Sequence, residues 1–122
     1  LTKYSEEILQ ALKIPYRVLN ICAGDLGMPA ASKYDIEAWL SSENRYRETH
    51  SSSYFHDFQT RRLNIRYKDK EGKMRFAHSL NNTALATPRI LVSILENNQN
   101  ADGSIRVPKV LQPYLGKDLI RK

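Results

Sequence analysis

Residues 76–99 read FAHSLNNTALATPRILVSILENNQ, a pattern that predicts a strand, a turn of small residues and then a long apolar helix. Thr87 is the expected N-cap, and Pro88 fits the first helical position, where its missing N–H costs nothing. Arg89 follows in the first turn, where a positive charge opposes the helix dipole. An anion held by Arg89 and the free backbone N–H groups would explain this position, so Arg89 is a candidate phosphate ligand. The alternative is an exposed arginine in a local salt bridge.

Helix and strand patterns also mark the rest of the chain. Residues 2–12 have apolar side chains at helical spacing, and Pro15 is expected to end that helix. Residues 68–73, KDKEGK, predict a hairpin turn. The other predicted elements are strands at 17–22, 35–40 and 46–53, a helix at 57–65, and an extended segment at 104–114 that Pro108 and Pro113 interrupt.

The predicted strand at 46–53, YRETHSSS, is polar on both sides. A regular alternation places its residues on two faces, with Tyr46, Glu48 and His50 on one and Arg47, Thr49 and Ser51 on the other. Burying such side chains is costly unless they have partners, which favours the floor or rim of a site. An exposed edge strand is the alternative interpretation.

Composition fits one domain or part of one, because 41% of the 122 residues are hydrophobic. The 19 basic and 13 acidic residues give a net charge of +6, which suits a polyanionic partner such as nucleic acid or a nucleotide. A basic protein without such a partner has the same composition. Basic residues cluster at Arg61, Arg62, Arg66 and Lys68, which indicates a contact with RNA or phosphate, or else a solvated basic face.

The single cysteine, Cys22, excludes an internal disulfide and a cysteine-cluster zinc site, and its apolar neighbours predict that it is buried. No apolar run approaches the roughly 20 residues needed to cross a bilayer, and no secretory signal pattern opens the chain. We therefore expect a soluble, intracellular protein, and its start at Leu1 suggests a segment of a longer chain. His50, His56 and His78 lack a metal-binding spacing, so polar or packing roles are expected.

Five blocks carry a resemblance to a known family: YDIEAWL (34–40), YRETHSSS (46–53), DFQTRRLNIRY (57–67), LNNTALATPRILVSILENNQ (80–99) and DGSIRVPKVLQPYLGK (102–117). In order and spacing they resemble the C-terminal half of the catalytic domain of seryl-tRNA synthetases. TALATPR (83–89) looks like the third signature motif of class II aminoacyl-tRNA synthetases, and its lack of glycines points toward the seryl branch.

The resemblance implies an α+β fold, an antiparallel sheet flanked by helices, as part of a class II synthetase catalytic domain. It implies a ligase that uses ATP and Mg²⁺ to make seryl-adenylate from serine and then transfers the seryl group to tRNA(Ser). Arg89 matches the arginine that holds the γ-phosphate of ATP, which makes it the candidate catalytic residue. Glu48 and Ser51 match the pair that engages the magnesium ion. Asn81 and Thr83 match positions that contact serine.

By the same resemblance, residues 1–122 are expected to be the C-terminal portion of the catalytic domain. The first and second motifs and the helical tRNA-binding arm are expected before Leu1, so this segment alone is expected to be inactive. The intact enzyme is expected to be a homodimer without membrane association, in the cytoplasm or an organelle. Two other interpretations stay open: a synthetase-like paralogue that acts as a non-catalytic RNA-binding or regulatory module, and a generic basic nucleic-acid binder.

Overall fold

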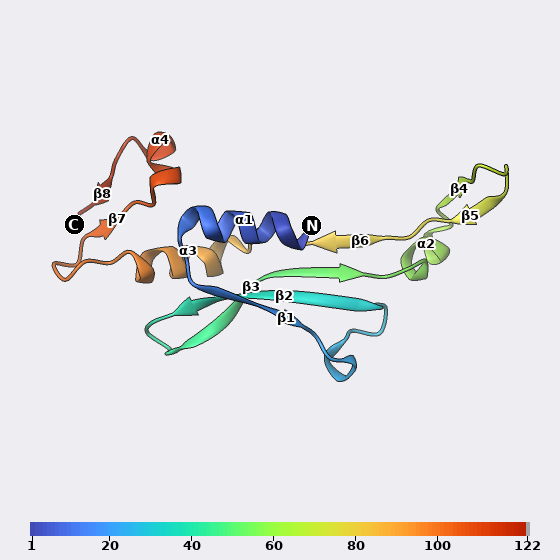
Figure 1. Cartoon of the computed structure of the whole chain (residues 1–122), viewed down its shortest axis with the longest axis horizontal. Coiled ribbons are helices and arrows are strands. Elements are labelled where there is room, and N and C mark those ends of the chain that lie inside the picture. The colour runs from blue at the N-terminus through green and yellow to red at the C-terminus, as the bar shows by residue number, and fades with distance from the viewer. Residues whose placement is uncertain (122) are drawn as a thin grey trace.

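A computed structural model describes residues 1–121 as an antiparallel sheet with two long helices beside it (Figure 1). In chain order the elements are α1 (Thr2–Leu12), β1 (Tyr16–Asn20), the 3-10 helix η1 (Ala23–Asp25), β2 (Ser32–Leu40), β3 (Arg45–Tyr54), α2 (Phe58–Leu63), β4 (Arg66–Lys68), β5 (Met74–Phe76), β6 (Leu80–Asn82), α3 (Thr87–Asn97), β7 (Ile105–Arg106), the 3-10 helix η2 (Lys109–Leu111), α4 (Gln112–Leu115) and β8 (Leu119–Ile120).

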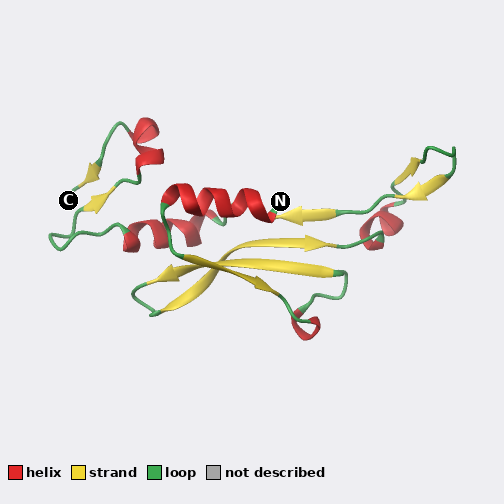
Figure 2. Cartoon of the chain, in the orientation of Figure 1, coloured by secondary structure: helices red, strands yellow, loops and turns green. Residues whose placement is uncertain are grey.

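The central sheet has the strand order β1-β2-β3-β6, and every pair of neighbouring strands in it is antiparallel. Helices α1 and α3 lie on the same side of this sheet (Figure 2). The expected α+β fold is therefore confirmed, with both long helices on one face. The opposite face of the sheet carries charged side chains such as Glu37 and Glu48, together with the aromatic pair of Trp39 and Tyr46.

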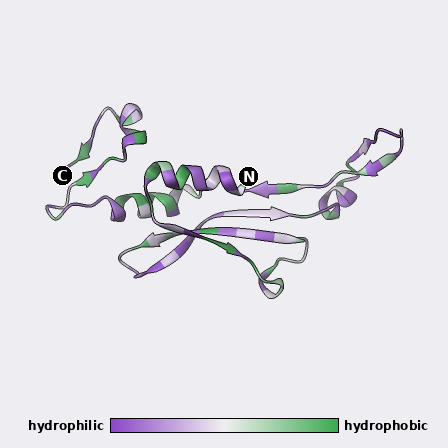
Figure 3. Ribbon diagram, in the orientation of Figure 1, coloured by the Kyte–Doolittle hydropathy of each residue, from purple (hydrophilic) through white to green (hydrophobic). Residues whose placement is uncertain are grey.

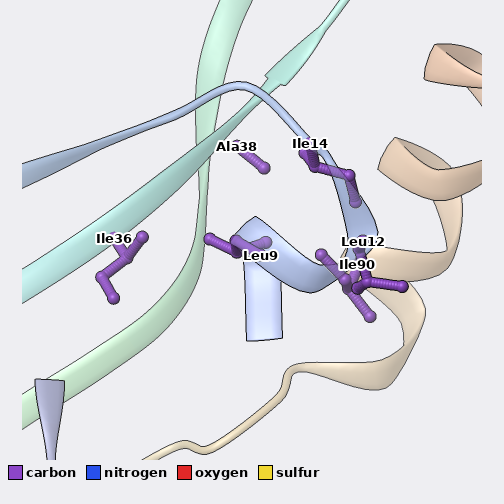
Figure 4. Close-up of a cluster of buried hydrophobic side chains, with 6 residues drawn as sticks. All are labelled: Leu9, Leu12, Ile14, Ile36, Ala38 and Ile90. Atoms are coloured by element: carbon purple, nitrogen blue, oxygen red, sulfur yellow. The ribbon is translucent and has the colours of Figure 1, made fainter. Parts of the chain in front are cut away.

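Six buried side chains form the core between the sheet and the two helices (Figure 4): Leu9, Leu12, Ile14, Ile36, Ala38 and Ile90. They come from α1, the segment after it, β2 and α3. Each large aliphatic side chain that is removed from water here contributes about 1.5–3 kcal/mol to folding. Because the core lies between β2 and α3, it also fixes where α3 starts relative to the sheet.

An arm of residues 57–76 projects from the end of the sheet (Figure 1). It consists of α2 and the hairpin of β4 and β5, whose turn contains Gly72 at a φ of 81°. The hairpin predicted at 68–73 is thus confirmed, and Figure 3 shows that its tip is hydrophilic. The helix predicted at 57–65 is shorter, since the left-handed Asn64 ends it.

The predicted start of α3 is wrong by one residue. Ala86, not Thr87, is the N-cap of α3, and it makes no capping side-chain bond. The N–H of Ala86 donates to the carbonyl of Thr49 at 3.2 Å, so a contact with β3 fixes this helix start. Helix α1 has the predicted bounds of residues 2–12, but the left-handed Lys13, with a φ of 58°, ends it before Pro15 is reached.

Two further predictions differ from the structure. Cys22 is exposed rather than buried, because β1 ends at Asn20 and the chain leaves the sheet before the cysteine. Pro113 lies in the first turn of α4 instead of interrupting an extended segment. Proline is favourable at this position, because the first N–H groups of a helix have no partner within it.

Candidate functional site

A β-bulge in β3 sets the geometry of the candidate site. Glu48 is paired with Glu37 of β2, and Ser51 is paired with Asp35. Between these pairs β2 advances by two residues while β3 advances by three, and the extra residue in β3 is Thr49. Residues that pair across an antiparallel ladder share a face of the sheet. Glu48 and Ser51 therefore lie on the same face.

The regular alternation predicted for residues 46–53 is wrong for this reason. Glu48 and Ser51 share the face of the sheet that is turned away from α1 and α3, while His50 is fully buried on the helix side. We call the first of these the open face, and its residues include Lys33, Asp35, Glu37, Glu48, Ser51, Ser53 and Asn81. The predicted magnesium pair is thus brought together by the bulge.

Strand β6 brings the two predicted serine-contacting residues to the same face. Asn81 is paired with Ser53, and the N–H of Thr83 donates to the carbonyl of Ser51 at 2.9 Å just beyond the end of β6. Both Asn81 and Thr83 are exposed. Their neighbour Asn82 points the opposite way and bonds to hydroxyl groups of β3 and α1. The four residues predicted for magnesium and serine therefore lie on the same face of neighbouring strands.

Three carbonyl groups of β3 hold the segment that leads from β6 into α3. The carbonyl of Ser51 accepts from Thr83 N at 2.9 Å, and the carbonyl of Thr49 accepts from Ala86 N at 3.2 Å. The carbonyl of Glu48 accepts from Arg89 Nη1 at 3.1 Å. The same bulge that aligns the open face thereby fixes the first turn of α3. As a result, Arg89 is placed beside Glu48.

Arg89 lies at the edge of the sheet next to Glu48. Its Nη1 atom is 3.5 Å from Glu48 Oε2, the longest ion pair among the described residues, and the two side chains are 59% and 40% exposed. A cleft of about 420 Å³ opens here, and it is lined by Leu40, Glu43, Arg47, Glu48, Thr49, Arg89 and Val92. A guanidinium has five N–H donors, so Arg89 keeps donors that can bind a phosphate in this cleft.

The second carboxylate in the cleft is already neutralised. Glu43 pairs with Arg47 and Arg45, each at 2.6 Å. Hydrogen bonds from Arg47 and then Arg45 lower the pKa of the Glu43 carboxyl. The loosely held Arg89 and Glu48 are therefore the charges in the cleft that remain available to a ligand.

His50 supports the bulge from the buried side of the sheet. The hydroxyl of Thr49 donates to the carbonyl of Ile36 at 3.2 Å, so Nδ1–H of His50 donates to the Thr49 oxygen at 2.8 Å. Burial lowers the pKa of the His50 imidazole, which keeps the ring neutral. This histidine has the polar packing role that its sequence predicts.

The other two histidines lie away from the cleft. Tyr54 Oη is 2.5 Å from His78 Nδ1, and the ring of His56 packs edge-on against both of these residues. The basic residues Arg61 and Arg62 lie nearby on the arm. The structure therefore separates the basic cluster from the residues predicted to bind ATP and serine.

Asp35 is a residue of the open face that sequence reasoning did not single out. It is 7% exposed, its Oδ2 pairs with Lys33 at 2.9 Å, and its buried Oδ1 has no partner among residues 1–121. The register of β2 and β3 shows that it adjoins Ser51.

The predicted magnesium ligands have suitable chemistry. Glu48 offers a carboxylate and Ser51 a hydroxyl on one face, and magnesium prefers oxygen ligands. Within residues 1–121, no group of three or more His, Cys, Asp or Glu side chains could hold a metal ion. Magnesium in nucleotide sites uses one or two protein ligands together with substrate phosphates and water, so Glu48 and Ser51 fit this mode of binding.

Comparison with known proteins places the chain in a family. Residues 1–98 match the family described as tRNA synthetase class II core domain (G, H, P, S and T). The chain belongs to this family. The resemblance to seryl-tRNA synthetases predicted from the sequence blocks is confirmed as well, because the relatives of this class II core domain include many serine–tRNA ligases.

Two such relatives are similar along nearly the whole chain. The serine–tRNA ligase of Deinococcus radiodurans is 57% identical over 112 residues, which cover 92% of this chain and 26% of the relative. The serine–tRNA ligase of Thermococcus sibiricus is 56% identical over 117 residues, which cover 95% of this chain and 26% of the relative. The chain therefore spans about a quarter of the length of these relatives.

Solved structures give the same result for the fold. The seryl-tRNA synthetase of Pyrococcus horikoshii, complexed with ATP, superimposes with a TM-score of 0.93 at 53% identity, covering 98% of this chain and 27% of that one. The cytoplasmic serine–tRNA ligase of Naegleria fowleri, in complex with AMP, superimposes with a TM-score of 0.87 at 47% identity, covering 96% of this chain and 28% of that one. Among residues 1–121, no helix is both long and apolar enough to cross a membrane.

Proposed function

We propose that this chain is the ATP- and serine-binding part of a serine–tRNA ligase, which makes seryl-adenylate and transfers the seryl group to tRNA(Ser). The observation that carries the proposal is the meeting of five residues from β3, α3 and the end of β6: Glu48, Ser51, Asn81, Thr83 and Arg89. The identity of 57% to a serine–tRNA ligase supports serine as the amino acid.

In the proposed reaction, the carboxylate of serine attacks the α-phosphorus of ATP and pyrophosphate leaves. A hydroxyl at the 3′ end of tRNA then attacks the seryl carbonyl, and AMP leaves. Arg89 donates to the γ-phosphate from the helix start, where it neutralises charge that pyrophosphate carries away. Asn81 and Thr83 hold serine with its carboxylate toward the nucleotide. No covalent bond to the protein is needed, because positioning and charge neutralisation supply the catalysis.

Glu48 and Ser51 are proposed to hold Mg²⁺ on the open face. When bound, Mg²⁺ neutralises phosphate charge and orients the triphosphate. Because Arg89 is only loosely paired with Glu48, its guanidinium could donate to phosphate while Glu48 holds the ion. The two residues thus act as one unit in the proposal.

The rest of the site is proposed to lie outside residues 1–122, including the first and second motifs and the tRNA-binding arm of the family. The intact enzyme is proposed to be a homodimer that acts in the cytoplasm on tRNA(Ser). We therefore expect residues 1–122 alone to show no serine-dependent exchange of pyrophosphate into ATP. Measurable exchange by this segment would contradict that expectation.

The test is the Arg89→Ala variant of the intact protein that contains this chain. Losing a charge-stabilising donor of this kind lowers the rate by about 10²–10³-fold, so exchange should fall by that amount. Arg45→Ala is the matched control, because Arg45 is an exposed arginine of β3 that bonds to Glu43. Unchanged exchange in Arg89→Ala overturns the assigned role. An intact protein that binds RNA but shows no exchange at all would instead be the non-catalytic module.

A further inference from the structure

Most of the net charge of the chain lies on the arm of residues 57–76, which we call the basic arm. It contains seven of the 19 basic residues and three of the 13 acidic ones, and thus a net charge of +4 out of the total of +6. The arm projects from the sheet on the side remote from β7, α4 and β8 (Figure 1). A projecting element with concentrated charge attracts polyanions over distances of about 8–10 Å at physiological salt.

Aromatic rings hold three arginines of the basic arm in place. The guanidinium carbons of Arg61 and Arg66 lie 4.7 Å and 4.4 Å from the centroid of the Phe76 ring. That of Arg62 lies 3.5 Å from the centroid of Phe58. Stacking fixes a guanidinium while its N–H groups remain free to donate sideways. Two guanidinium groups on one ring also repel each other, and a bound anion would remove that repulsion.

The charges of the basic arm are only partly neutralised. Arg61 pairs with Asp57 and Arg75 pairs with Asp69, whereas Arg62 and Arg66 have no carboxylate partner among residues 1–121. The three lysines of the hairpin also have no carboxylate partner among residues 1–121: Lys68, Lys70 and Lys73. Unpaired cations held close together are the expected footprint of a phosphate-binding surface.

Strand β4 places two of these cations side by side. Arg66 and Lys68 are two residues apart in β4 and share a face, which separates them by roughly 7 Å along the strand. Tyr67, which is 50% exposed, lies between them in sequence and offers a ring to an unstacked base. Two cations spaced along a strand suit a chain of negative charges better than they suit a single small anion.

We propose that the basic arm binds the phosphate backbone of RNA, and that this RNA is the tRNA substrate. The identity of the RNA rests on the proposed function. The arm also exposes Leu63 and Met74, which are 70% and 60% exposed, and these side chains would suit a protein partner instead. The experiment below separates the two partners.

The test compares charge variants of the intact protein in two assays. Arg66→Gln and the double variant Lys68→Gln/Lys70→Gln remove positive charges from the arm. The control Lys3→Gln/Lys117→Gln also removes two positive charges, but from exposed positions elsewhere. For the arm variants we expect the KM for tRNA to rise about tenfold. The slope of log binding constant against log salt should become shallower by about 0.7–0.9 per lost phosphate contact. Serine-dependent exchange, which needs no tRNA, should stay unchanged, as should both readouts in the control.

Each outcome has one meaning. Unchanged KM and salt dependence in the arm variants overturn the proposal. An altered oligomeric state or lost binding to a protein, with tRNA binding intact, overturns it in favour of a protein interface. If the unmodified intact protein shows neither exchange nor aminoacylation, the proposed function is wrong. RNA binding by the basic arm is then still tested, because the salt dependence of the tRNA binding constant can be compared between the unmodified protein and the arm variants.

Discussion

Glu48 and Ser51 are separated by an odd number of positions in β3, yet they face the same side of the sheet because Thr49 bulges between them. In a regular strand an offset of three residues puts side chains on opposite faces. The bulge therefore creates the proposed magnesium pair, and its carbonyl groups also fix Arg89 and Thr83 beside it. Bulges near active sites re-aim side chains in this way.

Glu48→Gln should raise the magnesium requirement of the intact enzyme. The amide keeps the size of the side chain but removes the negative charge that would bind the ion. We expect the Mg²⁺ concentration for half-maximal pyrophosphate exchange to rise by at least about tenfold, with part of the lost rate recovered at high Mg²⁺. The measurement is a magnesium titration of the exchange rate.

Glu43→Gln is the matched control for that titration. Glu43 lines the same cleft, but two arginines already neutralise it, so its loss should leave the magnesium requirement near its original value. An equal shift in both variants would show that the general charge of the cleft, rather than Glu48, sets the requirement.

Thr49→Val should destabilise the fold by about 1–3 kcal/mol, although the two side chains have nearly the same shape. The hydroxyl of Thr49 donates to the carbonyl of Ile36 and accepts from His50. Removing it leaves both groups buried without that partner. Urea unfolding measures the loss, and Thr49→Ser, which keeps the hydroxyl, should recover most of it. A stable valine variant would mean that these bonds contribute nothing to folding.

The periodic parts of the fold were predictable from the sequence. Residues 2–12 show helical spacing and form α1 with the predicted bounds, and the hairpin turn around Gly72 follows from its local residues. The five proposed site residues were found through the resemblance, whereas Arg89 was also a candidate from its position at a helix start. The helix, turn and helix-start signals are local, so no distant contact is needed to read them.

The bulge and the start of α3 were not predictable, because distant contacts determine them. Thr49 is the extra residue only in relation to β2, and Ala86 starts the helix only because its N–H meets the carbonyl of Thr49. Asp35 likewise gains its place beside Ser51 from the register of two strands. Single-sequence patterns contain no information about such registers.

Ile90→Ala should cost about 2–5 kcal/mol of unfolding free energy. Ile90 is 2% exposed in the core that joins α3 to the sheet, so truncation leaves a cavity. Leu91→Ala is the control on the same helix, since Leu91 is 51% exposed and should cost much less. Urea unfolding of both variants measures the difference. Similar losses would mean that Leu91 is covered in the protein tested, or that the core does not depend on α3.

The unfolding free energy should decrease as the pH is lowered through a window set by His50. Burial lowers the pKa of this imidazole below its ordinary value of 6.5, so the folded state binds fewer protons than the unfolded state. The contribution is complete above pH 6.5 and declines as the pH falls from there toward the lower pKa of the folded state. His50→Gln should remove this decline, whereas His56→Asn, at an exposed histidine, should retain it. Urea unfolding between pH 5 and pH 8 measures all three proteins, with the difference between wild type and His50→Gln isolating the imidazole from the carboxylates. A difference that stays constant across this range would mean that His50 titrates alike in both states.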